Sequence, residues 1–514
     1  MKKNYLFGCL GILTAATLFT ACSDDDNDST QQPEAAYVWT TDGGLKACDH
    51  LTFDADGKEN AEGMQIGNGD AEFVFTGKQT LKRGTYTLKG WVYVADGAEL
   101  TIEPGTVIKG DKQSKASLIV ERGGKLMARG NATAPIVFTS AQQAGERRPG
   151  DWGGLILCGR ALNNQAEMQI EGGPRTKHGG QDNADNSGVL SYVRIEFAGY
   201  PFNPDQEING LTLGSVGNGT QIDHVQVSYS NDDSFEWFGG SVNCKYLVAY
   251  HGWDDDFDTD NGFSGNVQYG LAVRNARIAD KSQSNGFESD NNASGSDATP
   301  FTTATFSNIT FVGPDLQNGV KFENTTDFIN AGDYNPNNGS ALGRFQASMH
   351  IRRSSRLNVI NCLAAGWPIG LILDGEKGDT PAQASKGGMR FHNNVMAQMG
   401  VLGTDANKVY DDVLYDAAGQ SVIDEKQSSF SSTFFRAESL HNQYFDTAAA
   451  LGLADGSGVG SAFMPQVGSP ALSAASFDGE TSSWFDKVNY AGAFNAGDNW
   501  MQGWTNFDPQ HTAY

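Results

Sequence analysis

The sequence of 514 residues predicts an all-β solenoid, in which the chain winds in coils and short parallel strands stack on one another. Three observations favour this fold. Short runs rich in Val, Ile and Leu alternate with Gly, Pro and Asn, which is typical of strands and turns. Asp232 begins a segment DDSFE and Asp254 begins a segment DDDFD, 254 − 232 = 22 residues later, so one looks like a copy of the other. The paths between successive strands are too short for the helices that usually connect parallel strands.

The first residues are expected to be a targeting signal rather than part of the fold. Two lysines precede an apolar run over residues 5–19, which is too short to span a bilayer comfortably and ends in small residues. This resembles a bacterial lipoprotein signal peptide over residues 1–21, with Cys22 as the lipidated first residue of the mature protein. An ordinary secretory signal is the alternative. Residues 22–36 are expected to be an acidic, disordered tether, which resembles the signal that sends some Gram-negative lipoproteins to the outer face of the outer membrane.

Two kinds of strand alternate in the predicted solenoid, which covers residues 90–400 after a polar entry region at residues 37–89. Strands of the second kind end in an apolar residue followed by an acid: Phe235-Glu236, Phe257-Asp258, Phe287-Glu288, Phe322-Glu323 and Leu373-Asp374. Because side chains alternate between the two faces of a strand, the aromatic residues are expected to stack inside the coils and the acids to face outward.

Residues 401–514 are expected to close the solenoid, because an open end would leave its apolar cross-section in water. Residues at intervals of three and four predict one amphipathic helix: Phe434, Ala437, His441, Tyr444, Ala448 and Leu451. The tail with Trp484, Trp500 and Trp504 is expected to complete this cap. Stacking against sugars is the alternative role for these tryptophans.

Four stretches carry a resemblance to a known family: VYVADGAELTIEPGTVIKG, WGGLIL, the segment from Asn231 to Gly265, and VNYAGAFNAGDNWMQGWTNFDP. Over roughly residues 91–509 the chain resembles secreted or lipid-anchored right-handed parallel β-helix proteins of Gram-negative bacteria. The resemblance implies a right-handed parallel β-helix, here with a C-terminal cap that contains a short α-helix. It implies no particular reaction, so function has to be argued from the site.

The composition excludes some partners. Thirty-six basic residues against 61 acidic ones give a net charge of −25, so nucleic acid, which is bound by basic surfaces, is not expected as a partner. Four cysteines besides Cys22 would remain in the mature chain: Cys48, Cys158, Cys244 and Cys362. Because they are widely spaced and lack the paired spacing of metal sites, they are expected to be small core residues. A disulfide is permitted outside the cell but not indicated.

The aspartates of the second acidic segment indicate a cation site. Asp254, Asp256, Asp258 and Asp260 occupy every second position, and in an extended segment they would share one face. The first acidic segment would lie one coil below them. Carboxylates this close raise one another's pKa unless a cation compensates them, and calcium prefers oxygen ligands of this kind. A solvated acidic face without an ion is the alternative.

The outward acids are also the candidates for binding an extracellular ligand. The expected ligand-binding residues are Asp232, Glu236, Trp253, Asp258, Glu288 and Glu323. If this face cleaved a glycan, Glu236, Asp258 and Glu288 would be the catalytic carboxyl groups, since acids on neighbouring coils could supply the separation of about 6.5–9.5 Å that inverting hydrolysis requires. A lyase would also need a base, for which the candidates are Lys321, Arg352 and Arg353.

These observations together predict a lipid-anchored β-helix on the outer surface of the outer membrane. Its expected role is to capture an extracellular ligand such as a polysaccharide, with calcium, in association with an outer-membrane transporter. A polysaccharide lyase or glycoside hydrolase that uses the same face is the first alternative. An adhesin or structural surface protein without a small ligand is the second.

Overall fold

The computed structural model of the chain describes two short strands near the N-terminus and most of residues 64–514. The described residues are 37–41, 44–47 and 64–514, without 68, 70–71, 166–167, 171–172, 174, 204–205, 281, 317–343, 407–427 and 455–462. The expected signal peptide and tether, Cys22, Cys48, Lys321, Phe322 and Glu323 all lie outside the described residues.

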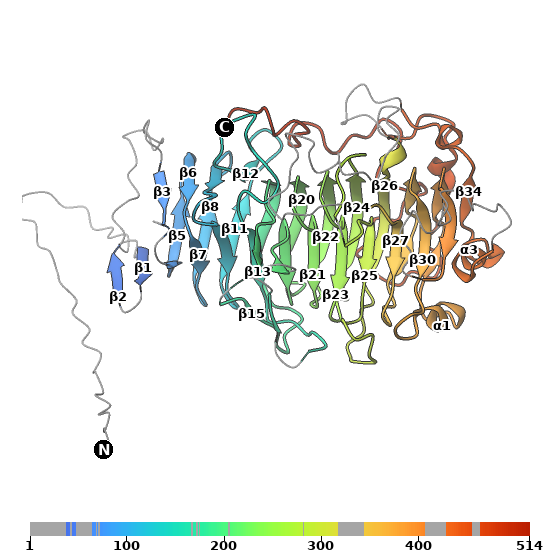
Figure 1. Cartoon of the computed structure of the whole chain (residues 1–514), viewed down its shortest axis with the longest axis horizontal. Coiled ribbons are helices and arrows are strands. Elements are labelled where there is room, and N and C mark those ends of the chain that lie inside the picture. The colour runs from blue at the N-terminus through green and yellow to red at the C-terminus, as the bar shows by residue number, and fades with distance from the viewer. Residues whose placement is uncertain are drawn as a thin grey trace, which may run out of the picture. The chain divides into compact units, whose positions relative to one another are not determined.

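Within the described residues, the first sheet, which we call sheet A, holds thirteen strands. Its strands in order are β2 (Gly44–Ala47), β1 (Tyr37–Thr41), β4 (Glu72–Phe75), β7 (Trp91–Val94), β10 (Ser117–Val120), β13 (Gly154–Cys158), β19 (Leu211–Gly214), β21 (Phe235–Phe238), β23 (Phe257–Asp260), β25 (Phe287–Ser289), β27 (Ala347–Ile351), β30 (Ile369–Leu373) and β33 (Val401–Thr404). The pairs of β1 with β2 and with β4 are antiparallel, and every later pair in the sheet is parallel. Figure 1 shows these strands following one another in chain order, from blue β7 to orange β30.

The second sheet, sheet B, holds seventeen strands in the part of the chain that the structure describes, in two faces that meet at a bend. Its long strands are β16 (Gly188–Glu196), β20 (Gln221–Ser228), β22 (Asn243–Tyr250), β24 (Asn266–Val273) and β26 (Thr305–Val312). Each bends at one residue in the left-handed region, with φ between 51° and 62°: Tyr192, His224, Tyr246, Tyr269 and Asn308. The remaining strands of the sheet are β3 (Met64–Ile66), β5 (Lys78–Leu81), β6 (Thr85–Leu88), β8 (Glu99–Ile102), β9 (Val107–Gly110), β11 (Lys125–Arg129), β12 (Ile136–Ser140), β28 (Asn358–Ile360), β29 (Leu363–Ala365), β31 (Phe391–His392), β32 (Val395–Ala397) and β34 (Gln443–Phe445). Each coil thus contributes one strand to sheet A and two strand segments to sheet B, which confirms the predicted parallel β-helix.

The interior of the coils contains the predicted aromatic stack. Phe235, Phe257 and Phe287 are register partners in sheet A and are fully buried, with ring centroids 5.5 Å and 6.0 Å apart. Burying each ring contributes about 1.5–3 kcal/mol. The next position in the register is Met349, where the sequence had suggested Phe322, and after it comes Leu371 rather than Leu373.

The cysteines in the described part of the chain are core residues, as predicted. Cys158, Cys244 and Cys362 are free thiols and are buried. Burial raises the pKa of all three. Neutral, enclosed thiols of this kind pack as small apolar groups.

The predicted C-terminal helix is only partly correct. A short helix, α3 (Phe430–Phe435), is capped by Ser429 and buries Phe435 against the last coils, which confirms a cap with a short α-helix. The single helix expected as far as Leu451 is wrong, because α3 ends at Phe435 and Ala437 adopts an extended conformation. The left-handed conformation of His441 then ends the following short helical turn. The chain then forms strand β34, which pairs with β32. Other short helices are α1 (Thr380–Ser385), η1 (Pro314–Leu316), η4 (Glu438–Leu440), η5 (Ala448–Leu451) and η6 (Pro470–Ser473).

The tryptophan-rich tail does not complete the end cap. It returns along the bend of sheet B, where Tyr490 stacks on Tyr269 and Trp500 packs on Tyr246. Its last residue, Tyr514, donates a hydrogen bond to Glu196 Oε1 at 2.6 Å, and Figure 1 shows the red tail ending above the cyan and blue strands. Trp504 is fully buried, so it is a packing residue rather than a surface for sugars. Among the described residues, no helix has the length and hydrophobicity needed to cross a membrane.

Candidate functional site

The outer surface of sheet A changes character between β19 and β21. Before this point it is apolar, and a loop segment that contains β14 (Met168–Gln169) and β15 (Lys177–His178) covers it. The buried residues there include Tyr93, Ile119 and Ile156, with Ile170 of the loop packed on them. On β21, β23 and β25 the outward positions next to the inward phenylalanines carry the acids Glu236, Asp258 and Glu288, as predicted from the alternation of Phe and acid. The loop therefore marks one boundary of the candidate site.

Two columns of side chains face outward on β21, β23, β25, β27 and β30. The first column is Glu236, Asp258, Glu288, His350 and Ile372, which are register partners. The second column lies two residues further along each strand and reads Phe238, Asp260, Asp290, Arg352 and Asp374. We call the acids of these columns on β21 to β25 the acidic face: Glu236, Asp258, Asp260, Glu288 and Asp290. At the position after Glu288 in the first column, where the sequence predicted Glu323, the structure has His350.

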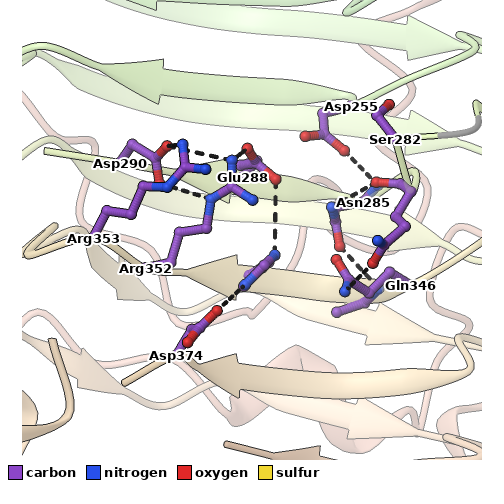
Figure 2. Close-up of polar contacts among 12 residues, drawn as sticks. Asp255, Ser282, Asn285, Glu288, Asp290, Gln346, Arg352, Arg353 and Asp374 are labelled. Atoms are coloured by element: carbon purple, nitrogen blue, oxygen red, sulfur yellow. Dashed lines mark hydrogen bonds and ion pairs between the residues drawn. The ribbon is translucent and has the colours of Figure 1, made fainter. Parts of the chain in front are cut away.

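At its C-terminal end the acidic face is compensated by cations. Arg352 contacts Glu288 and binds Asp290 through Nε at 2.8 Å, and Arg353 binds the same aspartate at 2.6 Å (Figure 2). His350 lies between two acids, with Nε2 3.2 Å from Asp374 Oδ2 and Nδ1 3.7 Å from Glu288 Oε2. Burial opposes the charge of Arg352, but Glu288 and Asp290 outweigh it and raise its pKa above the ordinary value.

Acid and amide side chains also connect successive coils at the start of the sheet A strands. Asp233 Oδ1 accepts a hydrogen bond from the backbone N–H of Asp255 at 2.8 Å, and Asp255 in turn accepts one from the N–H of Asn285. Asn285 Oδ1 then accepts one from the N–H of Ala347 at 3.0 Å, as Figure 2 shows in part. Asp233, Asp255 and Asn285 each lie two positions before the inward phenylalanine of their strand, so the pattern [DN]-x-F recurs in the sequence. That repeated spacing could have revealed this ladder, which the sequence analysis missed.

At the N-terminal end of the acidic face, several carboxylates lie close to one another. One oxygen each from Asp233, Glu236 and Asp258 lie within 4.8 Å of one another, and we call these three residues the carboxylate cluster. A second group, Asp232, Asp233 and Asp254, meets the same criterion. Burial raises the pKa of Asp233 and of Asp258 well above their ordinary values, and repulsion from the neighbouring acids adds to it.

Two oxygen atoms at the carboxylate cluster lack hydrogen-bond partners in the described structure. Asp258 Oδ1 is buried and unpaired. Asn209 donates a hydrogen bond from Nδ2 to Glu236, while its own buried Oδ1 has no partner. An unpaired buried oxygen costs about 1–3 kcal/mol unless something satisfies it. The cluster is therefore an all-oxygen site with the donor set that suits calcium.

A family model described as a pectate-lyase-like β-helix domain matches residues 74–432, which is 359 of the 514 residues. The chain belongs to this family. The matched region of this pectate-lyase-like β-helix runs from β4 into α3 and includes the whole acidic face. Comparison with curated proteins and with solved structures gave no match.

In this pectate-lyase-like β-helix the four aspartates that were predicted to share one face lie in different surroundings. Strand β23 begins only at Phe257, so alternation holds for Asp258 and Asp260 but not for the turn before them. Asp256 is fully buried and forms an ion pair with Arg274, whose Nη1 lies 3.1 Å from Asp256 Oδ1. Asp254 belongs to one acid group and Asp258 to the other. Asp256 is therefore paired with Arg274, and neither Asp256 nor Asp260 is a member of either acid group.

Trp253 is not a surface residue, contrary to the sequence analysis. It is fully buried in a cluster with Phe197, Tyr229 and Val248. Its backbone carbonyl accepts hydrogen bonds from Arg274 and Ser284, which fixes the turn before the acidic residues. It supports the shape of the site but cannot stack against a ligand.

The expected geometry for inverting hydrolysis is absent from the pair Glu236 and Asp258. Oxygens of these two side chains lie within 4.8 Å, whereas inverting enzymes hold their carboxyl groups about 6.5–9.5 Å apart to admit a water molecule. Glu288, the third predicted catalytic carboxyl group, is engaged by Arg352. The arrangement of Glu236 and Asp258 suits a shared cation or proton better than it suits that reaction.

Proposed function

We propose that the protein is a lipid-anchored surface β-helix that captures an extracellular glycan on its acidic face, together with a calcium ion. Membership of a pectate-lyase-like family supports a carbohydrate-related role. The lipoprotein-like start of the sequence supports a place on the outer membrane, facing the exterior. The negative net charge argues against nucleic acid as the ligand.

The observation that carries the proposal is the carboxylate cluster with its unpaired oxygens. Asp233, Glu236 and Asp258 would hold the cation, and Asn209 Oδ1 is a further oxygen within the same buried surroundings. Calcium takes six to eight oxygen ligands in flexible geometry, so sugar hydroxyl groups and water can complete its shell. When bound, the ion would supply positive charge that keeps the three acids ionised.

The rest of the acidic face supplies hydrogen-bonding groups for a polyhydroxylated ligand. Glu288, Asp290 and Arg352 hold one another in place through ion pairs, so their positions are fixed before a ligand arrives. Side chains that are already ordered lose less conformational entropy on binding. A row of such groups along successive coils suits an extended oligosaccharide better than a compact molecule.

The proposal is tested by measuring calcium binding to the mature chain by isothermal titration calorimetry, followed by titration of a glycan panel with and without calcium. We expect one calcium site that is lost in Asp258→Asn and kept in the control Asp478→Asn, which changes an exposed acid of the tail. Glycan binding should require calcium. Equal calcium affinity in Asp258→Asn and wild type would rule out the carboxylate cluster as the site.

A second candidate, a polysaccharide lyase or hydrolase, is favoured by the array of Glu288, His350 and Asp374 beside Arg352. An imidazole can act as a general acid or base, and a neighbouring guanidinium can stabilise a developing negative charge. Product analysis on the glycan panel separates the two candidates. Release of unsaturated or reducing ends that disappears in Arg352→Lys would favour the enzyme, whereas binding without turnover favours capture.

The proposed location and partner have their own tests. Protease treatment of intact cells should remove the protein if it faces the exterior, and full protection would contradict surface display. An outer-membrane transporter is the proposed partner for uptake of the captured glycan, and co-purification after cross-linking would detect it. Binding to host or neighbouring cells without any glycan affinity would instead favour an adhesin.

A further inference from the structure

A cavity lies beside the loop that contains β15. Its volume is about 680 Å³, and it is lined by the turns after β7, β10 and β13 together with the loop that contains β15. The charged residues that line it are Asp96, Glu121, Arg122, Arg160, Arg175, Lys177 and Asp182. These are four cations and three acids, so the lining carries 4 − 3 = +1 in a chain of net charge −25. A local excess of positive charge in an acidic protein favours an anionic ligand.

Arg175 lines this cavity and is held in place by several contacts. Its guanidinium binds Glu121 through two parallel contacts of 2.9 Å and 3.0 Å and binds Glu72 at 3.0 Å. It also lies over the ring of Tyr93, 4.4 Å from the centroid. Through these contacts Arg175 ties the loop to the coils. It is not expected to bind the ligand itself.

Arg122 and Arg160 keep hydrogen-bond donors for a ligand. Within the described structure, Arg122 uses Nη1 to donate to the carbonyl of Gly179, and Arg160 uses Nη2 to donate to Asp96 and to the carbonyl of Arg122. A guanidinium has five N–H groups, so each arginine retains several. The contact between Arg160 and the backbone of Arg122 places the two residues side by side on neighbouring coils.

We propose that this cavity binds a sulfate or phosphate group of an extracellular ligand. Arg122 and Arg160 bring two positive charges to the lining, of which Asp96 pairs with the second, and a doubly charged oxyanion can interact with both arginines more strongly than a singly charged carboxylate can. Planar guanidinium forks also match the oxygens of tetrahedral oxyanions. Lys177, on the loop above, adds a third positive charge to the lining. The site is separate from the acidic face, with which it shares no lining residue.

The test is calorimetric titration of the mature chain with inorganic sulfate, inorganic phosphate and acetate at constant ionic strength. We expect binding of the two tetrahedral ions and weaker binding of acetate. Arg122→Gln and Arg160→Gln should each weaken binding by about tenfold or more, since each removes charge-assisted hydrogen bonds. Arg129→Gln, which changes an exposed arginine outside the cavity, should leave the affinity unchanged.

Further titrations identify the source of the oxyanion and keep this site distinct from the first one. A sulfated and a phosphorylated monosaccharide are compared, and a preference for either supports the cavity and names the ester. Asp258→Asn should bind the oxyanions as wild type does, even if it has lost calcium. The proposal is overturned if tetrahedral ions bind no better than acetate, if both arginine variants bind like wild type, or if Asp258→Asn abolishes binding.

Discussion

Asp256 and Asp258 are two residues apart and chemically identical, yet the structure gives them opposite surroundings. Asp258 faces outward in β23 beside Glu236 and Glu288, and Asp256 is buried against Arg274. Burial raises the pKa of Asp256 to about 6 although Arg274 opposes this, whereas repulsion from other acids adds to the burial effect at Asp258. At the residue scale, one acid is structural and the other is available for chemistry.

The acidic face makes stability depend on pH. Carboxyl groups whose pKa is raised in the folded state bind more protons there than in the unfolded chain, so their contribution is present at low pH and lost as pH rises through the folded pKa. Burial and Asp290 raise the pKa of Asp260 to about 8. We therefore expect the Tm of calcium-free protein to fall by several degrees between about pH 4 and about pH 8, as measured by scanning calorimetry. Calcium should reduce this fall, and Asp258→Asn should reduce it without calcium; a flat profile would contradict the raised pKa values.

The buried ion pair predicts a large loss of stability when one partner is removed. Arg274 has no exposed side-chain surface and also donates hydrogen bonds to the backbone carbonyls of Trp253 and Asp254. Arg274→Gln should lower the free energy of unfolding by about 3–5 kcal/mol, because it leaves a buried carboxylate unpaired. Urea denaturation of this variant beside Arg277→Gln, an exposed arginine in the same turn, provides the measurement. A loss equal to that of the control would show that Asp256 does not need its partner.

At the scale of the elements, the bend of sheet B is a column of left-handed residues. Tyr192, His224, Tyr246 and Tyr269 stack there at centroid distances of 4.2 Å, 4.4 Å and 5.0 Å. Asn308 continues the column, and its Nδ2 donates to the carbonyl of Tyr490 at 2.7 Å. The column therefore both turns each long strand and provides the surface on which the tail packs.

Substitution of Asn308 separates these two roles. Asn308→Gly keeps the left-handed conformation but loses the hydrogen bond to the tail, and Asn308→Ala loses both. We expect Ala to cost about 1 kcal/mol more than Gly in thermal or chemical unfolding. Both variants should make the tail near residue 490 easier to cleave in limited proteolysis. Equal stability of the two variants would mean that backbone strain at the bend is unimportant.

At the scale of the whole molecule, each coil of the described solenoid contacts mainly its neighbours, while the tail connects coils that are far apart in sequence. Gln226 donates to the carbonyl of Asn506 at 2.7 Å, and Gln268 donates to the carbonyl of Asp486 at 2.8 Å. Arg147 donates to the carbonyl of Thr512 at 2.8 Å. In a solenoid stability is close to a sum of neighbour terms, so a strap of this kind adds long-range contacts that the coils lack.

Removal of the tail's main anchor should therefore have a local effect. Trp504 is fully buried and packs on Tyr192 and His224. Trp504→Ala should cost about 3–5 kcal/mol where it packs. Hydrogen exchange should rise in the tail and in β16 to β24 but not in β30 or α3, and Trp504→Phe should restore most of the protection. A uniform rise along the whole chain would show instead that the solenoid unfolds as one unit.

Local patterns in the sequence predicted most of the fold but only part of the candidate site. The alternation of Phe and acid at residues 235–236, 257–258 and 287–288 correctly placed one set inside and the other outside, because a strand has a period of two. The same rule failed at Asp256 and Trp253, which lie in a turn where that period does not apply. His350 could not be placed, because an insertion before β27 obscures the rung to which it belongs.

The sequence by itself determined the parallel β-helix, the inward aromatic stack and the outward acids, since these depend on repeats of adjacent residues. Only the tertiary structure decided that Asp233, Glu236 and Asp258 share one cluster, that Arg352 compensates Glu288, and that the tail straps the bend rather than capping the end. These contacts depend on which coil lies beside which and on loops of unequal length. The register in which the coils stack, rather than the strand propensity of single segments, therefore brings the repeated acidic segments together as a candidate site.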